Sequence, residues 1–433
     1  MAGLQVFSAR VLHLLLKSAC ASATGDSTAP VLSTTVLRCL MPLRSIKVIE
    51  LGSLIAGPFA TRLLAEFGAE VIKIEPPGQG DPLRRWRKLY KNTSLWWFVQ
   101  SRNKKSLTLN LKTPQARDIL RKLLQDTDIL VENFRPGVLE RLGLDPNELL
   151  TLNPRLIVVR LSGYGQTGPY AGRPGFGAVG ESMGGLRYVT GFADRPPVRT
   201  GISIGDSLAA LFAVIGALMA LHHRSRTGEG QLVDVALYEA VFALMESMVP
   251  EFDAMGFIRE RTGNIMPGIT PSSTHTSQEG IPLLIAANGD DIFVRLCQLM
   301  QRQDWLQRPE FKDNAGRDTH RDEIYRAIDA WAAQFPADVL LQQLAAADIP
   351  ASRIYSVADM FKDPQFMHRE LLIRHTLADG QSLCVPGIVP KLSKTPGEIR
   401  WLGPLLGEHN HEILQKLGFS LEAIQQLQAQ GVL

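Results

Sequence analysis

A regular alternation of short apolar strands and amphipathic helices, beginning near Ile46, constrains the fold more than any other feature of the sequence. The strand patterns IKVIEL and AEVIKIE flank the helical pattern PFATRLLAEF, in which Pro58 occupies a favoured first-turn position. Two further cycles follow, with strand patterns at 106–111, 128–133 and 155–163 and a helix pattern at 114–125. This alternation predicts a mainly parallel sheet with helices on both faces.

The same pattern indicates where ligands bind and how the chain divides. Ligands of parallel α/β sheets bind beyond the carboxyl ends of the strands. The informative loops are therefore those that follow Leu51, Glu75, Glu132 and Leu161. Near Asp253 the alternation gives way to polar, Pro/Gly-rich stretches separated by helical patterns. We expect an α/β fold with a Rossmann-like large domain at 41–252, a smaller α+β domain at 253–362, and a C-terminal segment at 363–433 that returns to the large domain.

Composition narrows the class of protein. The 433 residues are 45% hydrophobic and 21% charged, which is typical of a soluble globular enzyme. A formal net charge of +3 is small for this length and argues against a nucleic-acid partner. The longest apolar stretch, Leu208 to Leu221, is shorter than the ~20 residues that span a bilayer. We interpret it as a buried core helix and predict no membrane span.

Residues 1–40 have the composition of a mitochondrial presequence. Up to Ile49 the chain carries five basic residues and a single acid, Asp26, among many Ser, Thr and Ala. A secretory signal is the competing interpretation, but the apolar run at 11–16 is short and interrupted by His13. A cytosolic protein is the third. We predict location in the mitochondrial matrix.

The candidate nucleophile is Asp206, in the sequence GISIGDS directly before the apolar helix pattern. An aspartate at a helix N-terminus accepts backbone N–H bonds and meets the positive end of the helix dipole. Both effects favour its ionised, nucleophilic form. The simpler interpretation is that Asp206 only caps the helix, because capping aspartates are very common.

Basic residues recur around the predicted strand ends. Arg102 and Lys104 precede the strand pattern at 106–111, and Arg135 and Arg141 follow the one at 128–133. If they converge, their charge suits the phosphates of a nucleotide. Taken singly, each is better explained as a solvated surface charge. A glycine-rich loop at 163–177 permits close backbone approach to a ligand, or is simply a flexible connection.

Several common sites are absent from the sequence. The loop GSLIAG lacks the GxGxxG spacing of dinucleotide-binding folds and the Lys-Ser/Thr of a P-loop. No GxSxG motif is present, which disfavours a serine hydrolase. The histidines form no HExxH or similar ligand set. We therefore predict no metal.

Taken together, six segments resemble the class III coenzyme A transferase family, in family order from about Ile46. They are AGPFATRLLAEFGAEVIKIEPPGQGDPLR, NKKSLTLNLK, VENFRPGVLERLGL, LSGYGQTGPYAGRPGFG, GDSLAALFAVIGAL and PLLGEHNHEIL. The resemblance implies that Asp206 attacks an acyl-CoA thioester and passes through a mixed anhydride and an aspartyl-CoA thioester, without a metal or redox cofactor. It is strongest to members that move coenzyme A from succinyl-CoA to glutarate or 3-hydroxy-3-methylglutarate, and it implies an interlocked homodimer.

The resemblance also implies coenzyme A contacts. The positions that match are Leu109, Lys112, Asn133, Phe134, Arg135 and Arg141. Two positions depart from the family: Ile55 replaces a glutamine and Pro76 replaces an arginine, which puts the adenine and phosphate contacts near the first loop in doubt. For the far carboxylate of a dicarboxylic substrate, Arg84, Arg85 and Arg87 are candidates, and surface charges are the alternative.

Two other functions stay open at this point. The related 2-methylacyl-CoA racemases use the equivalent aspartate for proton exchange, together with a His-Asp pair that is replaced here by Phe176-Gly177. An inactive nucleotide-binding protein needs only the basic strand ends, with Asp206 as a cap.

Overall fold

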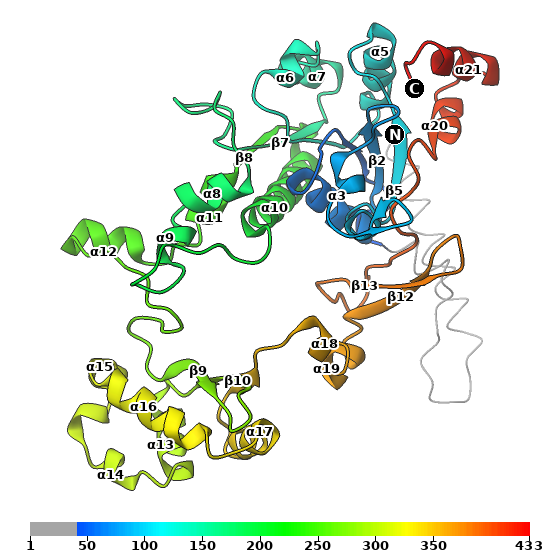
Figure 1. Ribbon diagram of the computed structural model, residues 1–433. Coiled ribbons are helices and arrows are strands. Elements are labelled where there is room, and N and C mark those ends of the chain that lie inside the picture. Colours follow the sequence, from blue (N-terminus) through cyan, green and yellow to red (C-terminus); the bar gives the residue numbers. More distant parts are fainter. Residues whose placement is uncertain (1–40) are drawn as a thin grey trace, which may run out of the picture.

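The computed structural model describes residues 41–433, so the predicted presequence at 1–40 lies outside the described residues. The large domain is built on a six-stranded parallel sheet (Figure 1). Its strands are β1 (Lys47–Glu50), β2 (Glu70–Glu75), β5 (Lys104–Thr108), β6 (Ile129–Glu132), β7 (Ile157–Ser162) and β8 (Leu232–Ala236), in the order β5-β2-β1-β6-β7-β8. The predicted Rossmann-like sheet is thus confirmed, and β8 is a strand that the sequence analysis did not predict.

The strand order determines where a ligand can bind. Counted along the chain, the strands follow the 3-2-1-4-5-6 order of doubly wound folds, which reverses direction between β1 and β6. At that point the loops after the two strands diverge to opposite sides of the sheet and leave a crevice. The loops at 51–55 and 133–137 flank it.

Helices cover both faces of the sheet and bury two apolar cores. On one face lie α3 (Ala56–Glu66) and α10 (Ile204–Thr227). The other face is covered by α5 (Pro114–Leu124), α6 (Val138–Arg141), α7 (Pro146–Leu152), α20 (Asn410–Lys416) and α21 (Leu421–Ala429). The last two belong to the C-terminal segment, and the backbone N–H of Asn110 donates to the carbonyl of Val432 at 2.8 Å. Residues about 320 positions apart therefore complete one core.

Helix α10 is a core helix, as predicted, on one of its faces only. It is 24 residues long, and its length and apolar composition would permit a membrane span. Small side chains, among them Ala213 and Ala217, line its buried face, while Ile215 and Met219 on the other face are exposed. The small residues let α10 pack closely on α3, and the large apolar ones point outward. A helix pattern that is apolar on all sides did not show which face carries the small residues.

The large domain also contains several further short elements. They are β3 (Leu89–Tyr90), β4 (Thr93–Ser94), α4 (Leu95–Gln100), α8 (Gly177–Met183), α9 (Leu186–Val189), α11 (Leu237–Phe242), α12 (Met248–Met255) and the 3-10 turn η1 (Pro82–Arg85).

A small domain lies below the large one in Figure 1 and has its own apolar core. Its antiparallel sheet has the order β11-β10-β9. The strands are β9 (Ser272–Thr276), β10 (Pro282–Ala286) and β11 (Ala351–Arg353). The helices are α13 (Asp290–Leu299), α14 (Gln303–Leu306), α15 (Asn314–Thr319), α16 (Arg321–Ala332), α17 (Ala337–Ala346), α18 (Val357–Met360) and α19 (Pro364–His368), with the turn η2 (Pro309–Phe311). The hairpin of β12 (Leu372–Thr376) and β13 (Ser382–Pro386) leads back to the large domain.

Candidate active site

Two adjacent cavities lie at the carboxyl ends of the strands. The first, of about 350 Å³, is bounded by the loops after β1, β6 and β7 and contains Asp206; we call it the Asp206 cavity. The second, of about 340 Å³, is bounded by the loops after β1, β2 and β5; we call it the strand-end cavity. Ser53 and Phe134 line both. A long substrate with two chemically different ends can thus place one end in each cavity, on either side of the wall that Ser53 and Phe134 form.

Asp206 lies in the first turn of α10, two residues after the helix begins at Ile204. The N-cap position is occupied by Ser203, and no side chain caps this helix. The interpretation of Asp206 as a simple cap is therefore wrong. Its carboxyl group is instead turned into the Asp206 cavity, beside the glycine-rich loop.

The electrostatic prediction for Asp206 also needs correction. Burial, followed by the negative charge of Glu181, raises the pKa of Asp206 to about 6. Arg199 and the backbone amide of Asp206 act in the opposite direction but are outweighed. Helix position therefore does not by itself favour the ionised form here. At pH 7 most of the carboxyl is still ionised, and it is less solvated and more basic than an ordinary aspartate.

Close packing of glycines brings the loop against this carboxyl. A β-carbon at position 177 would lie 2.6 Å from Cγ of Asp206. At the base of the loop, Gly163 and Gly175 approach so closely that a β-carbon on Gly163 would lie 2.7 Å from Cα of Gly175. Position 177 has no room for the acid that the racemases carry there. The loop therefore leaves Asp206 without a second acid–base group from this side.

Most of the predicted coenzyme A contacts line the two cavities. Leu109 and Lys112 line the strand-end cavity, Asn133 and Arg135 line the Asp206 cavity, and Phe134 is shared. The structure does not bring Arg141 into either lining; it is exposed on α6.

Arg102 and Lys104 do not reach the cavities, and the prediction that they bind the nucleotide is wrong for this structure. Both are completely buried. Arg102 pairs with Glu66 at 2.6 Å, and Lys104 pairs with Glu50 at 2.8 Å. The physical reason is their place in the strand: β5 begins at Lys104, whereas ligands bind beyond the last residue of a strand.

Of the three candidates for the far carboxylate, only Arg87 lines the Asp206 cavity. Its guanidinium lies over the ring of Trp96, 4.5 Å from the centroid. Arg84 forms an ion pair with Glu75 at 2.8 Å, and Arg85 donates to the carbonyl of Gln79 at 2.8 Å.

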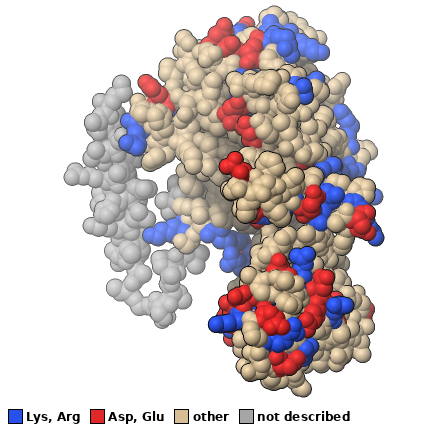
Figure 2. Space-filling view, turned by 90° about the vertical axis from the view of Figure 1, so that its left-hand side faces the viewer, with Lys and Arg blue, Asp and Glu red and all other residues tan. Residues whose placement is uncertain are grey.

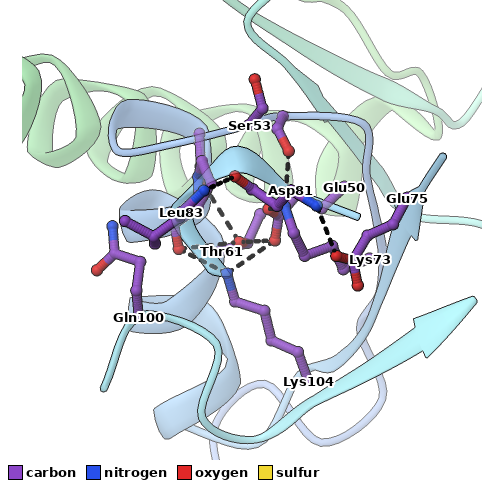
Figure 3. Close-up of polar contacts among 12 residues, drawn as sticks. Glu50, Ser53, Thr61, Lys73, Glu75, Asp81, Leu83, Gln100 and Lys104 are labelled. Carbon is purple, nitrogen blue, oxygen red and sulfur yellow. Dashed lines mark hydrogen bonds and ion pairs between the residues drawn. The ribbon is translucent and has the colours of Figure 1, made fainter. Parts of the chain in front are cut away.

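A buried ionic network, which the sequence analysis missed, holds the loop that separates the cavities (Figure 3). Lys73 pairs with Glu50 at 2.6 Å and with Asp81 at 2.8 Å, and it donates to the carbonyl of Gly52 at 2.7 Å. Asp81 accepts the backbone N–H of Leu54 at 3.1 Å, a residue with a φ of 65°. The sequence contained a sign of this network, because charged residues stand inside the otherwise apolar strand patterns VIEL and VIKIE.

The network is charge-balanced and keeps its groups ionised. Burial lowers the pKa of Lys73, but Asp81 and Glu50 outweigh burial and raise it above its usual value. For Lys104 burial dominates and lowers the pKa to about 8. Asn133 also holds the loop that contains Ser53. Its side chain accepts the backbone N–H of Ser53 at 2.8 Å and donates to the carbonyl of Ser53 at 2.9 Å. The wall between the two cavities is therefore fixed before a ligand arrives.

Comparison with known proteins decides the family. The family model described as CoA-transferase family III matches residues 43–410. The chain belongs to this family. It is a CoA-transferase, and the resemblance seen in its motifs is confirmed.

Relatives of this family III CoA-transferase are similar along nearly their whole length. The succinyl-CoA--D-citramalate CoA-transferase of Chloroflexus aurantiacus is 49% identical over 394 residues, which is 90% of this chain and 98% of the relative. The succinyl-CoA:glutarate CoA-transferase of Mus musculus is 32% identical over 397 residues, 91% of each. The crystal structure of a CAIB/BAIF family protein from Brucella suis matches with a TM-score of 0.77 at 32% identity, covering 87% of this chain and 99% of that one.

Proposed function

We propose that this CoA-transferase moves coenzyme A from succinyl-CoA to glutarate or a related dicarboxylic acid such as 3-hydroxy-3-methylglutarate, with Asp206 as the nucleophile. The observation that carries the proposal is the carboxyl of Asp206, turned into a cavity beside a glycine-rich loop with no second acid at position 177. The printed names of the relatives support the substrates: both name succinyl-CoA, and the acceptors are D-citramalate and glutarate. All of these acids carry two carboxylates.

The reaction proceeds through four balanced steps. An oxygen of Asp206 attacks the thioester carbonyl of succinyl-CoA, the C–S bond breaks, and the coenzyme A thiolate leaves a mixed anhydride. The thiolate attacks the carbonyl of Asp206, the C–O bond breaks, and succinate departs. The acceptor carboxylate then attacks the aspartyl-CoA thioester and releases the thiolate again. Attack of the thiolate on the acceptor acyl group restores the carboxylate of Asp206. No step needs a metal or redox cofactor, and coenzyme A enters as a substrate.

The two cavities offer separate places for the two ends of the thioester. We assign the nucleotide to the strand-end cavity, where Leu109 and Lys112 lie at the end of β5, and the acyl group to the Asp206 cavity. Asn133, Phe134 and Arg135 lie on the loop after β6 between them. Arg141, exposed nearby on α6, is the remaining candidate for a phosphate contact.

The proposal includes a homodimer that works in the mitochondrial matrix. Large apolar side chains that are exposed on α10, α11 and α12 support the dimer. They are Leu211, Ile215, Met219, Phe242, Phe252 and Met255. In Figure 2, which faces the left-hand side of Figure 1 where α12 is labelled, much of the surface of the upper lobe carries neither Lys or Arg nor Asp or Glu. Extensive exposed apolar surface is typical of a site of protein association.

The experiment is an acceptor panel with succinyl-CoA as donor: glutarate, 3-hydroxy-3-methylglutarate, D-citramalate, oxalate and water alone. We expect the five- and six-carbon dicarboxylic acids to be the best acceptors. Succinyl-CoA alone, followed by hydroxylamine, is expected to modify Asp206, as detected by mass spectrometry. Asp206→Ala serves as the control. An unmodified Asp206 peptide, or transfer that persists in Asp206→Ala, would count against the covalent route. Deuterium uptake at the α-carbon of 2-methylacyl-CoA without an acceptor would favour a racemase instead.

A further inference from the structure

Arg199 is one of the arginines that line the Asp206 cavity. Its side chain is 50% exposed. The carboxylate paired with it, Glu181, lies 3.9 Å from Nε of Arg199, which is beyond hydrogen-bond distance. Within residues 41–433 the structure gives the guanidinium no hydrogen bond. A planar fork of N–H groups is thus held beside the nucleophile and is free to bind a carboxylate.

The other arginines of this cavity are placed differently. The guanidinium carbon of Arg173 lies over the ring of Tyr170, 3.6 Å from its centroid, and Arg87 lies over Trp96. Arg135 follows Phe134 on the wall shared with the strand-end cavity. Among these cations, only Arg199 acts on the ionisation of Asp206. It is therefore the arginine most directly coupled to the reacting carboxyl.

The buried carboxylate of Glu181 keeps Arg199 in position by charge and leaves the N–H groups of its guanidinium able to bind another carboxylate. Glu181, on α8, is 1% exposed and lies 3.4 Å from Nε of Arg187. Its other oxygen faces the backbone N–H of Gly205 at 3.5 Å, at the start of α10. Glu181 thus connects α8, α9 and the segment that leads into α10, so Arg199 and Asp206 are held relative to one another.

The charge balance around this group changes when Asp206 is acylated. Before reaction, the carboxylates of Glu181 and Asp206 face the guanidiniums of Arg187 and Arg199. Formation of the mixed anhydride, in which the acyl group is attached to Asp206, makes Asp206 neutral and removes one negative charge. A dicarboxylic acyl group returns that charge, because its far carboxylate is only a few carbon–carbon bonds from the new anhydride bond. A monocarboxylic acyl group leaves a guanidinium unbalanced in a partly desolvated site, which is unfavourable.

We propose that Arg199 binds the far carboxylate of the dicarboxylic acyl group and thereby selects dicarboxylic over monocarboxylic acids. The assignment rests on the proposed function, because only an acyl group attached to Asp206 brings a carboxylate to this place. The predicted candidates Arg84 and Arg85 are engaged elsewhere in the fold, and the guanidinium of Arg87 lies over Trp96.

The test compares two isotope-exchange reactions, each of which uses one acid in both half-reactions: labelled glutarate with glutaryl-CoA, and labelled valerate with valeryl-CoA. Arg199→Gln is expected to lower kcat/KM for the glutarate pair about 100-fold, the loss expected for a charged hydrogen bond worth about 3 kcal/mol. Exchange of the valerate pair is expected to stay the same or rise. The matched control is Arg195→Gln, which changes an exposed arginine of the same loop that lines neither cavity.

A second readout separates a direct role from a general disturbance. Because Arg199 lowers the pKa of Asp206, its removal is expected to move the acidic limb of the pH profile to higher pH, whereas Arg195→Gln leaves the limb in place. If Arg199→Gln folds poorly, Arg199→Lys keeps the charge and is expected to retain part of the glutarate preference.

The outcomes are distinct. If the wild-type protein exchanges normally and both Arg199 variants keep its ratio of kcat/KM for glutarate to kcat/KM for valerate, only the assignment to Arg199 is overturned. Loss of the preference in Arg173→Gln but not in Arg199→Gln overturns that assignment as well. Absence of exchange in the wild-type protein with either acid overturns the proposed function and this inference with it.

Discussion

Replacement of Asp206 by asparagine tests the electrostatic description of the site, because asparagine keeps the size of the side chain and removes its charge. The pKa of Asp206 is raised from 3.8 to about 6, first by burial and then by Glu181. The folded protein therefore holds this proton more tightly than the unfolded chain does. The difference is roughly two pKa units, which at about 1.4 kcal/mol per unit corresponds to about 3 kcal/mol.

The sign follows from proton linkage. Between about pH 4 and pH 6 the carboxyl is ionised in the unfolded chain but still protonated in the folded one, so stability falls as the pH rises through this window. Above pH 6 the full cost of a charged Asp206 is present. Asparagine is neutral throughout. We expect the free energy of unfolding of Asp206→Asn to equal that of the wild type near pH 4 and to exceed it by about 2–3 kcal/mol at pH 7.5.

The measurement is urea unfolding followed by tryptophan fluorescence at several pH values from 4.5 to 8, with Asp194→Asn as a control on an exposed carboxyl of the same region. The stabilised variant is also expected to lose CoA transfer, which would show that the nucleophile is maintained at a cost in stability. A stability difference that is the same at pH 4.5 and pH 7.5, or larger at the acidic end, would refute the reasoning.

Three further predictions concern the surroundings of this carboxyl. Glu181→Gln removes a negative charge that, after burial, raises the pKa of Asp206. The acidic limb of the pH profile of kcat/KM is expected near pH 6 in the wild type and should shift to lower pH in this variant. A shift to higher pH would contradict the assigned charge effect. Gly177→Ala should lower CoA transfer at least ~100-fold with the circular dichroism spectrum unchanged, because its β-carbon would displace Asp206, and full activity would show that the loop has room. Arg102→Gln removes one of the two arginines paired with buried Glu66 and leaves Arg62 at 2.8 Å from this carboxylate. It should lower the free energy of unfolding by about 2 kcal/mol without changing KM for succinyl-CoA, whereas a rise in KM at unchanged stability would restore the nucleotide-binding interpretation.

The sheet was predictable from the sequence because its signal is local. Apolar runs of four to six residues between turns identified β1, β2, β6 and β7, and the rule for parallel sheets then placed the ligand site at their carboxyl ends. Strand β8 was missed because the charged Asp234 interrupts its short apolar run. Its position became evident only from its pairing with β7.

The polar part of the site was harder to predict, because it depends on which residues meet in space. A basic residue before a strand looks the same in sequence whether it faces a ligand or, as Arg102 and Lys104 do, a buried glutamate. The raised pKa of Asp206 could not be foreseen either. It follows first from burial and then from Glu181, which is 25 positions away along the chain and comes near only through the packing of α8 on α10. The sequence singled out Asp206 as the candidate, whereas its environment required the fold.

The hydrogen bond between Asn110 and Val432 has a consequence for biosynthesis. The loop at 109–112 forms one wall of the strand-end cavity, and it is tied to a carbonyl that leaves the ribosome more than 300 residues later. While the small domain is being translated, one face of the parallel sheet still lacks α20 and α21 and exposes apolar surface. The nascent large domain therefore keeps this apolar surface exposed until the final helices emerge, and the strand-end cavity is among the last parts of the protein to be completed.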